Sequence, residues 1–412
     1  MEENRIVKLS DVCDLIPGFA FKSSEFGEHV TKAVKIGDIQ PPYVNYESMA
    51  GVDVSRYTDT KLSKYKISKG DFVLAMTGAT IGKIGRYISN TGAYINQRVL
   101  KFKPHDNVNA DYIYYIVSSA IFQKYILNNI DSETAQPNIS AGSVGKYEFY
   151  LPSIEEQNRI ASILVALDNK IQINRQINDN LELQAQALYK SWFVDFEPFC
   201  EEEFIETSLG SIPAGWKVGQ LSDICEIVGG GTPSKIHPEY YCSRGIAWIT
   251  PKDLSVSKSK FSSRGSEDIT SDGYKNSSAK LMPRGTVLFS SRAPIGYISI
   301  ATNEICTNQG FKSAVPGIAG TGYLYYFLQA NTDKIESKAS GSTFKEASGS
   351  LMKTLEVIIP ADGILKQFEA ELAPILNKQE SIAREIQTLT TLRDTLLPKL
   401  MSGELRINEI DC

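Results

Sequence analysis

The stretch "IASILVALDNKIQINRQINDNLELQAQALYKSW", from Ile160 to Trp192, decides the fold. Along it, apolar residues recur at alternating steps of four and three, which is the heptad pattern of helices that pair in a coiled coil. Two asparagines, Asn174 and Asn178, interrupt the apolar seam. A polar residue in such a seam lowers stability and fixes register and partner. The pattern therefore predicts a long helix that pairs with one specific second helix.

The same seam returns 208 residues later, from Phe368 to Leu400, and its interior polar residues are Gln379 and Arg393. These occupy different repeat positions from the two asparagines, as expected for two helices that pair with each other. The alternative is two ordinary amphipathic helices that each pack on their own domain. Pro374 lies early in the second seam and should kink this helix or delay its start.

The helices belong to a longer internal repeat. "LSDVC" at Leu9–Cys13 returns as "LSDIC" at Leu221–Cys225, a shift of 212 residues. "KGDFVLAMTGATIG" at Lys69–Gly82 returns as "RGTVLFSSRAPIG" at Arg284–Gly296. This period is far longer than the repeats of solenoid proteins. It indicates two copies of a unit in which a domain is followed by a helix.

Each copy begins with a domain of short alternating apolar runs, separated by turn residues, which predicts many short strands with some helix. "DYIYYIVSSAIFQKYIL" at Asp111–Leu127 and "GYLYYFLQANTDKI" at Gly322–Ile335 predict the matching helix of each copy. We expect an α+β fold. Two similar mixed α/β domains are joined by two long helices that form an antiparallel coiled coil, with pseudo-two-fold symmetry. The expected boundaries are 1–152 for the first domain, 153–198 for the first helical region, 199–215 for a surface linker, 216–360 for the second domain and 361–403 for the second helical region.

The composition is that of a globular protein, with 42% hydrophobic and 22% charged residues among 412. There is no apolar run of about eighteen residues, and the start "MEENRIVKLS" has no apolar core, so we expect neither a membrane span nor a secretory signal. The six cysteines form no C-x-x-C pair and only three histidines are present, which gives poor support for a zinc site. Scattered thiols fit a reducing cytoplasm.

The net charge of −5 argues at first against a nucleic-acid partner. However, residues 1–150 hold 17 Lys+Arg against 16 Asp+Glu, and residues 207–360 hold 16 against 12. The acidity lies in the helical segments, where residues 151–206 hold 4 against 11 and residues 361–412 hold 6 against 9. An anionic partner is therefore compatible with both domains.

Three stretches resemble the specificity (S) subunit of type I restriction-modification systems. They are "LPSIEEQNRIASIL" where the first helix begins, "ALYKSWFVDFEP" where it ends, and "LLPKLMSGEL" near the C-terminus. The domain openings "IPGFAFKSSEF" and "VGGGTPSKIHPEYY" look like the start of that family's target recognition domains. The resemblance covers essentially the whole chain.

This resemblance implies a cytoplasmic, non-catalytic subunit that binds double-stranded DNA. Each target recognition domain would read one half of an asymmetric split sequence. The helices would act as a ruler and dock two methyltransferase (M) subunits, and restriction (R) subunits can join where present. No cofactor is expected in this chain, whereas S-adenosylmethionine, ATP and Mg²⁺ are expected on the partner subunits.

The rod length agrees with such a role. A helix of about 32 residues is about 48 Å long, and half-sites on one face of DNA lie about 34 Å apart per helical turn. A scaffold that presents two globular domains to protein partners, without binding DNA, would use the same rod and is the alternative function.

Motifs for catalysis are incomplete. "QPPYVNY" at Gln40–Tyr46 resembles the N/D-P-P-Y/F motif of adenine methyltransferases, but Gln replaces the first residue. "GGGTPS" at Gly229–Ser234 lacks the lysine of a P-loop. An enzyme with an unrecognised site is the third possibility, and it predicts activity in the isolated chain.

Base edges are read by polar and basic side chains, and glycine-rich loops let the backbone approach DNA closely. The candidates are Lys22, Ser23, Lys35, Thr77, Thr80, Lys83 and Arg86 in the first domain, and Thr232, Ser234, Lys235, Thr250, Lys252, Ser291 and Arg292 in the second. Asn96-Gln97 and Asn308-Gln309 recur in both copies and either contact adenine or satisfy buried backbone groups. Trp192, Phe193 and Phe196 either anchor a methyltransferase subunit or cap the core where the helix meets the second domain.

Overall fold

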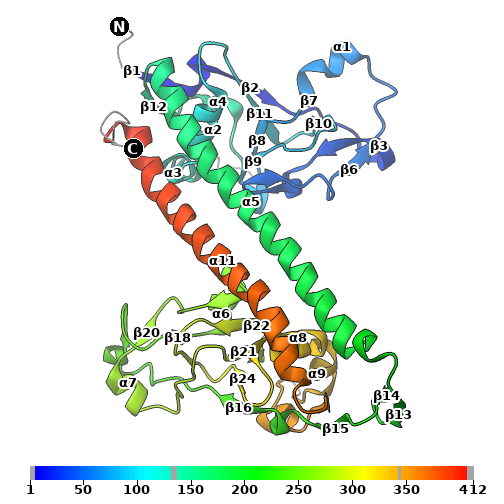
Figure 1. Ribbon diagram of the computed structural model, residues 1–412. Coiled ribbons are helices and arrows are strands. Elements are labelled where there is room, and N and C mark those ends of the chain that lie inside the picture. Colours follow the sequence, from blue (N-terminus) through cyan, green and yellow to red (C-terminus); the bar gives the residue numbers. More distant parts are fainter. Residues whose placement is uncertain (1–4, 131–136, 342–344, 406–412) are drawn as a thin grey trace. The chain divides into compact units, whose positions relative to one another are not determined.

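The computed structural model describes residues 5–130, 137–341 and 345–405 (Figure 1). The chain forms two compact units. Unit 1 comprises Met1–Ile171 with Thr388–Cys412, and unit 2 comprises Gln172–Gln387. Each unit therefore contains one mixed domain together with part of each long helix.

The domain of unit 1 is built on a sheet of six strands in the order β2-β11-β8-β9-β5-β4. The strands are β2 (Cys13–Pro17), β11 (Val99–Pro104), β8 (Phe72–Ala75), β9 (Ile84–Arg86), β5 (Tyr43–Val44) and β4 (Ile39–Gln40). A second sheet has the order β6 (Ala50–Val52), β3 (Phe26–Val34), β10 (Ala93–Ile95) and β7 (Lys66–Ile67), and β1 (Arg5–Lys8) pairs with β12 (Glu148–Leu151). Strand β8 is buried on both faces, because Phe72 and Leu74 belong to one core cluster and Val73 and Ala75 to another.

Unit 2 repeats this topology in its sheet β16-β24-β21-β22-β19. These strands are β16 (Cys225–Gly229), β24 (Lys312–Pro316), β21 (Val287–Ser291), β22 (Ile295–Ala301) and β19 (Phe261–Ser262). Two-stranded pairs are formed by β15 (Lys217–Gln220) with β25 (Glu356–Ile359), β17 (Tyr241–Cys242) with β20 (Asp268–Ile269), and β18 (Trp248–Ile249) with β23 (Cys306–Thr307). The first four strands follow the order of β2-β11-β8-β9, which confirms the predicted repeat.

The helix predicted over Asp111–Leu127 is two helices, α2 (Ala110–Ser118) and α3 (Ala120–Asn128). Ser119 lies between them in an extended conformation, and its hydroxyl accepts a hydrogen bond from the backbone N–H of Phe122. A serine can end one helix in this way because its hydroxyl caps the first turn of the next helix. In unit 2, Asn331 likewise separates α8 (Thr321–Ala330) from α9 (Thr332–Lys338). The shorter helices are α1 (Asp59–Leu62), α4 (Ala141–Gly145), α6 (Pro251–Ser257), α7 (Ser271–Lys275) and α10 (Gly349–Lys353).

The two long helices are α5 (Ile154–Phe193) and α11 (Ile364–Ser402). The expectation that Pro374 delays the second helix is wrong, since α11 begins well before it. Phe368 and Leu372 are fully buried there, and this packing offsets the backbone hydrogen bond that proline removes. The predicted seam residues of both helices are all buried or half-buried.

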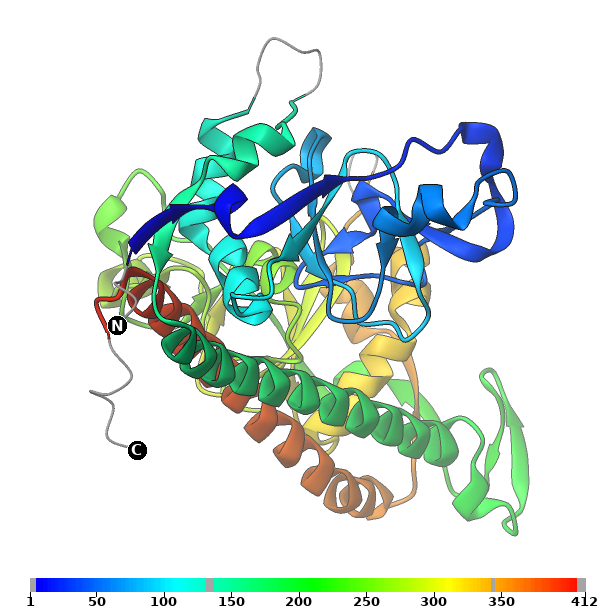
Figure 2. The same cartoon turned by 90° about the horizontal axis from the view of Figure 1, so that it is seen from above.

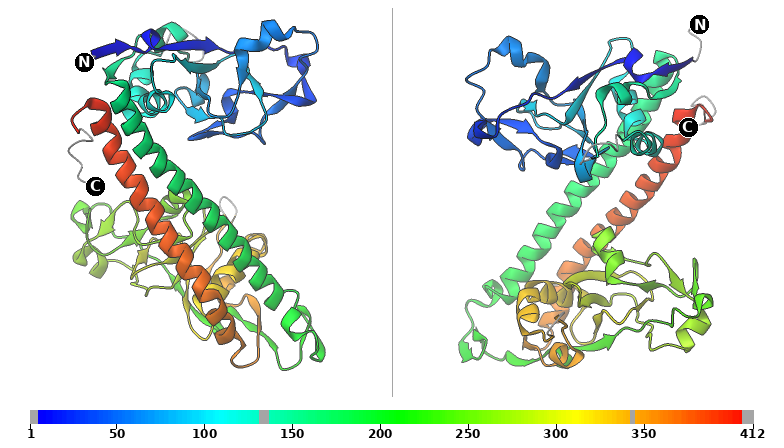
Figure 3. Two further views of the ribbon diagram at one scale, coloured as in Figure 1. Left: turned by 45° about the horizontal axis from the view of Figure 1, so that its top comes forward. Right: turned by 180° about the vertical axis from the view of Figure 1, so that it is seen from behind.

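Within each unit the two helices run antiparallel and pack on each other and on the domain (Figure 3). In unit 1, Ile160 and Leu164 of α5 share a core cluster with Leu400 of α11. In unit 2, Ala185 and Trp192 share a cluster with Leu372 and Phe368. The pairing predicted from the seams is therefore present, together with the packing of each helix on a domain.

The segment expected as a linker contains a hairpin, in which β13 (Phe204–Thr207) pairs with β14 (Gly210–Pro213). Figure 2 shows this hairpin projecting beyond the end of α5. None of the described helices is long and apolar enough to cross a membrane. The five cysteines in the described ranges are free, and Cys412 lies outside those ranges.

Candidate nucleic-acid interface

In both units, the loop that opens the domain packs against the recurring Asn-Gln pair. A Cβ atom on Gly18 would lie 2.0 Å from the backbone oxygen of Asn96, and one on Gly230 would lie 2.0 Å from the backbone oxygen of Asn308. Only glycine permits such an approach. The fold thus brings the loop residues that follow Gly18 and Gly230 beside Asn96-Gln97 and Asn308-Gln309.

In unit 2 this arrangement joins several predicted residues. The hydroxyl of Thr232 donates a hydrogen bond to the Oε1 atom of Gln309, although 77 residues separate them. Ser234 and Lys235 follow in the same loop, and both are exposed. Thr232 and Gln309 are therefore joined beside the glycine-rich turn, and Ser234 and Lys235 are exposed in the loop that continues from it.

The two residues of the Asn-Gln pair have different surroundings. Asn308 is half-buried, and its Oδ1 atom accepts a hydrogen bond of 2.9 Å from the backbone N–H of Gly310. Asn96 is also half-buried, and its Oδ1 atom has no partner among the described residues. Gln97 and Gln309 are exposed. Asn308 thus satisfies a backbone group, while the glutamines lie where a ligand can reach them.

In unit 1, Lys22 and Ser23 are exposed at the opening loop, and the Nζ atom of Lys35 lies 3.6 Å from the ring centre of Phe26. In the turn after β8, Lys83 is exposed and Thr80 is half-buried. Among these predicted residues, Lys22, Ser23 and Lys83 are exposed, and Lys35 and Thr80 are half-buried.

Several other predicted contacts are engaged within the protein. Arg86 lies 2.6 Å from Asp111 and stacks on the ring of Tyr114, so it tethers β9 to α2. Thr250 caps α6, and its hydroxyl donates to Asp253 at 2.7 Å. Lys252, in the first turn of α6, is exposed.

Two of the predicted residues are buried. Ser291 is fully buried and its hydroxyl donates to the backbone oxygen of Gly310, while Thr77 is 6% exposed. Ser291 is the last residue of the buried strand β21, and Thr77 lies two residues after the buried strand β8. The sequences of these strands alone do not show where burial ends. Arg292, which follows Ser291, is half-buried and lies 3.6 Å from Glu346.

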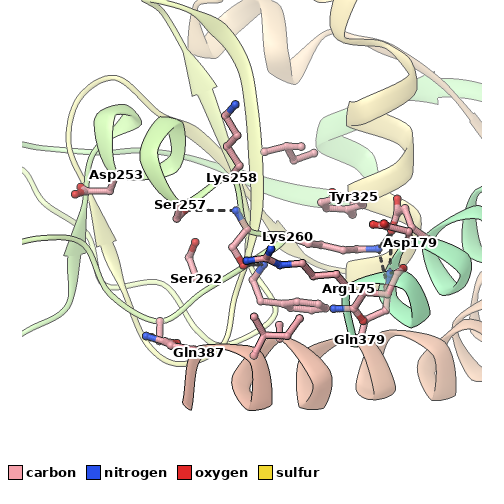
Figure 4. Close-up of a pocket in the computed structure, with 18 of the residues that line it drawn as sticks. Arg175, Asp179, Asp253, Ser257, Lys258, Lys260, Ser262, Tyr325, Gln379 and Gln387 are labelled. Carbon is pink, nitrogen blue, oxygen red and sulfur yellow. Dashed lines mark hydrogen bonds and ion pairs between the residues drawn. The ribbon is translucent and has the colours of Figure 1, made fainter. Parts of the chain in front are cut away.

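Unit 2 also contains a cavity of about 700 Å³ between α5, α11 and the segment that precedes β19 (Figure 4). The ammonium group of Lys260 lies 2.6 Å from Glu182 of α5 and 2.9 Å from the amide oxygen of Gln379 of α11. The hydroxyl of Tyr326 also donates to Glu182. Burial raises the pKa of Glu182, but the charge of Lys260 and these hydrogen bonds outweigh it and hold the pKa below its ordinary value.

Unit 1 holds a related cluster on its own parts of the helices. Arg393 of α11 lies 2.7 Å from Asp168 of α5, and the hydroxyl of Tyr115 donates to the same carboxylate at 2.7 Å. Gln379 donates to Glu182 at 3.1 Å, so both polar residues of the second seam, Gln379 and Arg393, bind a carboxylate of α5. The sequence revealed the seam residues but not Lys260, because nothing in the pattern connects a loop lysine to a helix distant in sequence.

Comparison with known families gives a decisive match. The model of the type I restriction modification DNA specificity domain matches residues 1–183 and again residues 213–399. The chain belongs to this family. Each match covers one domain and most of the helix that follows it, so the family's repeat coincides with the repeat in the fold.

Curated members of the family align along most of the chain. The specificity subunit of the type I restriction enzyme MjaIX of Methanocaldococcus jannaschii is 43% identical, over 95% of this chain and 97% of that protein. The specificity subunit of HindI of Haemophilus influenzae is 26% identical, over 83% of this chain and 88% of that protein. The S subunit of a type I system from M. genitalium, known from a crystal structure, shares the fold with a TM-score of 0.62 at 14% identity, over 97% of this chain and 96% of that one.

In this member of the family, the aromatic residues at the end of α5 are part of the core of unit 2. Trp192, Phe193 and Phe196 are 8%, 8% and 9% exposed. The ring of Phe193 lies 4.8 Å from those of Tyr323 and Phe368. These residues cap the core, which was one of the two alternatives, and a contact between their exposed edges and a partner stays a prediction.

Proposed function

We propose that this chain is the DNA sequence-specificity subunit of a type I restriction-modification complex. Each unit reads one half of a split target. The observation that carries the proposal is the double family match, because each copy falls on a complete domain with its helix. A protein that reads one undivided target would need only one copy of the domain and its helix.

The two halves of the target differ because the two candidate interfaces differ. Where unit 2 has Thr232, Ser234 and Lys235 beside Gln309, unit 1 has Lys22 and Ser23 in the loop beside Gln97. Different donors and acceptors at equivalent places select different base edges. The target is therefore asymmetric, and the exposed residues of each loop are the proposed contacts.

The partners in this proposal are two methyltransferase subunits and, where the source cell has them, restriction subunits. Chemistry resides in those subunits, which carry S-adenosylmethionine, ATP and Mg²⁺, and this chain recognises DNA without catalysis. A place in the cytoplasm belongs to the same proposal. The long helices carry the docking surfaces for the methyltransferase subunits.

The test is methylome sequencing of cells that express this chain with its neighbouring methyltransferase subunit. Cells with the methyltransferase subunit alone are the control. The proposal predicts a new split motif with N6-methyladenine in both halves. If the two proteins copurify and no new motif appears, the chain is a scaffold and the proposal is wrong.

A further inference from the structure

The domain of unit 1 carries a continuous group of aromatic rings near its surface. The ring centre of Phe19 lies 4.8 Å from that of Phe21, 4.9 Å from that of Tyr57 and 5.3 Å from that of Tyr65. Phe26 joins the group through Phe21 at 6.2 Å. Phe19, Phe26, Tyr57 and Tyr65 are only half-buried, so the edge of the group faces solvent.

Three lysines lie over these rings. The Nζ atom of Lys35 is 3.6 Å from the ring centre of Phe26, that of Lys61 is 5.2 Å from Tyr57, and that of Lys64 is 4.9 Å from Tyr65. A ring face attracts the ammonium group and restrains the flexible side chain. We call Lys35, Lys61 and Lys64, together with the rings beneath them, the lysine–aromatic patch.

The positive charge of the patch is not cancelled by ion pairs. Within the described ranges, no carboxylate lies within ion-pair distance of these three ammonium groups. The nearby carboxylates have other hydrogen-bond or ion-pair partners. Asp38 accepts from the backbone N–H of Lys35 and from the hydroxyl of Ser48, both at 2.8 Å. Glu25 is buried and accepts from the hydroxyl of Tyr57 at 2.7 Å, and Asp59 lies 3.6 Å from Lys66. Each ammonium group therefore keeps donors free for an external anion.

Unit 2 has no equivalent patch among its described residues. The described part of unit 2 has one cation over a ring, Lys260, which lies over Tyr325 and Tyr326 and is bound to Glu182. In unit 1, β3 and α1 lie on the side of the domain away from α5 (Figure 1). Within the described ranges, the patch is thus specific to unit 1 and lies away from α5.

We propose that the lysine–aromatic patch binds the phosphate backbone of the target DNA beside the half-site read by unit 1. This inference rests on the proposed function. Three restrained, unpaired cations match a row of phosphates by charge, and lysine binds phosphate as a point charge without reading bases. The patch therefore positions the duplex and adds affinity that depends on salt, but it does not determine sequence.

The experiment measures binding of the full-length chain to a labelled duplex that carries its methylome motif, between 50 and 200 mM KCl. The test variant is Lys35→Gln/Lys61→Gln/Lys64→Gln. The matched control is Lys103→Gln/Lys124→Gln/Lys146→Gln, which removes the same charge from exposed lysines of unit 1 away from the rings. Each phosphate contact contributes about 0.9 to the slope of log K against log salt.

The proposal predicts that the slope of the test variant is shallower by about 2.7, and that affinity falls about 40-fold less than for the wild type across this salt range. The control keeps the wild-type slope. The single variant Lys61→Gln keeps Lys35 and Lys64 over their rings, and it makes the slope shallower by about 0.9. The methylated motif stays the same in Lys61→Gln and in the control variant.

Four results would overturn the inference. They are a wild-type slope in the test variant, an equal change in the control, a changed first half of the motif, or a loss of copurification with the methyltransferase subunit at an unchanged slope. The last result would make the patch a protein contact. Failure of the wild type to bind any duplex would instead refute the proposed function, so the two failures are distinguishable.

Discussion

The guanidinium group of Arg393 lies 2.7 Å from the carboxylate of Asp168, although 225 residues separate them in the sequence. The side chains are 25% and 27% exposed, and Tyr115 of the domain donates to the same carboxylate. One carboxylate of α5 thus connects the other long helix with the domain of unit 1. In unit 2, Glu182 connects Gln379 with Lys260 and Tyr326 in a comparable way.

Replacement of Asp168 by alanine leaves Arg393 without this partner and Tyr115 without its acceptor. We expect a loss of about 1–3 kcal/mol in the free energy of unfolding, because part-buried polar groups are left unpaired. Urea denaturation measures it. The exposed carboxylate Asp106 provides the control, and Asp106→Ala should cost less than about 0.5 kcal/mol. Equal losses in both variants would show that the contacts of Asp168 stabilise the fold no more than an exposed carboxylate does.

The Glu182 cluster predicts that the free energy of unfolding depends on pH. The pKa of Glu182 is lower in the folded chain than in the unfolded chain, mainly because Lys260 offsets the effect of burial. Protons therefore bind preferentially to the unfolded state, and the stability from this pair is present above the unfolded pKa and lost as pH falls through the folded value. Glu182→Gln should lose less stability than the wild type between pH 7 and pH 4. A parallel loss in both proteins would contradict this.

The aromatic cap at the end of α5 should be essential for the stability of unit 2. Phe193→Ala removes a ring that packs between Tyr323 and Phe368, and we expect a cost of about 3–5 kcal/mol. Val194 is 54% exposed, and Val194→Ala should stay within about 0.5 kcal/mol. Thermal unfolding distinguishes the two. A normal melting temperature for Phe193→Ala would show that the ring is not part of the core.

Lys235 tests the candidate interface of unit 2. It is exposed in the loop beside Gln309. Lys235→Gln should therefore make the slope of log K for DNA binding against log salt shallower by about 0.9. Lys217→Gln removes another exposed charge, from strand β15, and should leave the slope unchanged. If the two variants behave alike, the loop at Lys235 does not face the phosphates.

Gln309→Ala probes base reading rather than charge. A direct contact to a base edge contributes about 1–3 kcal/mol of discrimination. We expect the variant to accept more than one base at one position in the second half of the methylated motif. Asn308→Ala should mainly lower stability, because its side chain binds the backbone of Gly310. An unchanged motif in Gln309→Ala would remove this residue from the interface.

Much of the fold was predictable because it rests on periodicity. The heptad seams predicted buried faces from Ile160 to Trp192 and from Phe368 to Leu400, and the repeated "LSD" segments located the two domains. The break at Ser119 was missed because an apolar helical pattern continues across it, while one hydroxyl caps the next helix. The second helical region was expected from residue 361 and α11 begins at Ile364, but the expected effect of Pro374 was wrong because tertiary packing at Phe368 outweighs it.

The candidate site was less predictable. Polar loop residues were recognised by type, but type does not distinguish an exposed lysine such as Lys235 from a tethered arginine such as Arg86. Burial of Ser291 depends on strands that are distant in sequence. The lysines at positions 61 and 64 gave no signal by themselves, since their significance comes from rings that only the fold places beneath them.

The most direct test of the central claim, that each unit reads one half of the target, is a duplication of one domain. Residues 9–151 are replaced by residues 221–359, which run between the same repeat positions, and the methylome is sequenced with the methyltransferase subunit present. We predict that the bases of the first half disappear and that both halves of the motif carry the bases of the original second half. An unchanged asymmetric motif, produced by a folded chain that copurifies with its partner, would contradict the account.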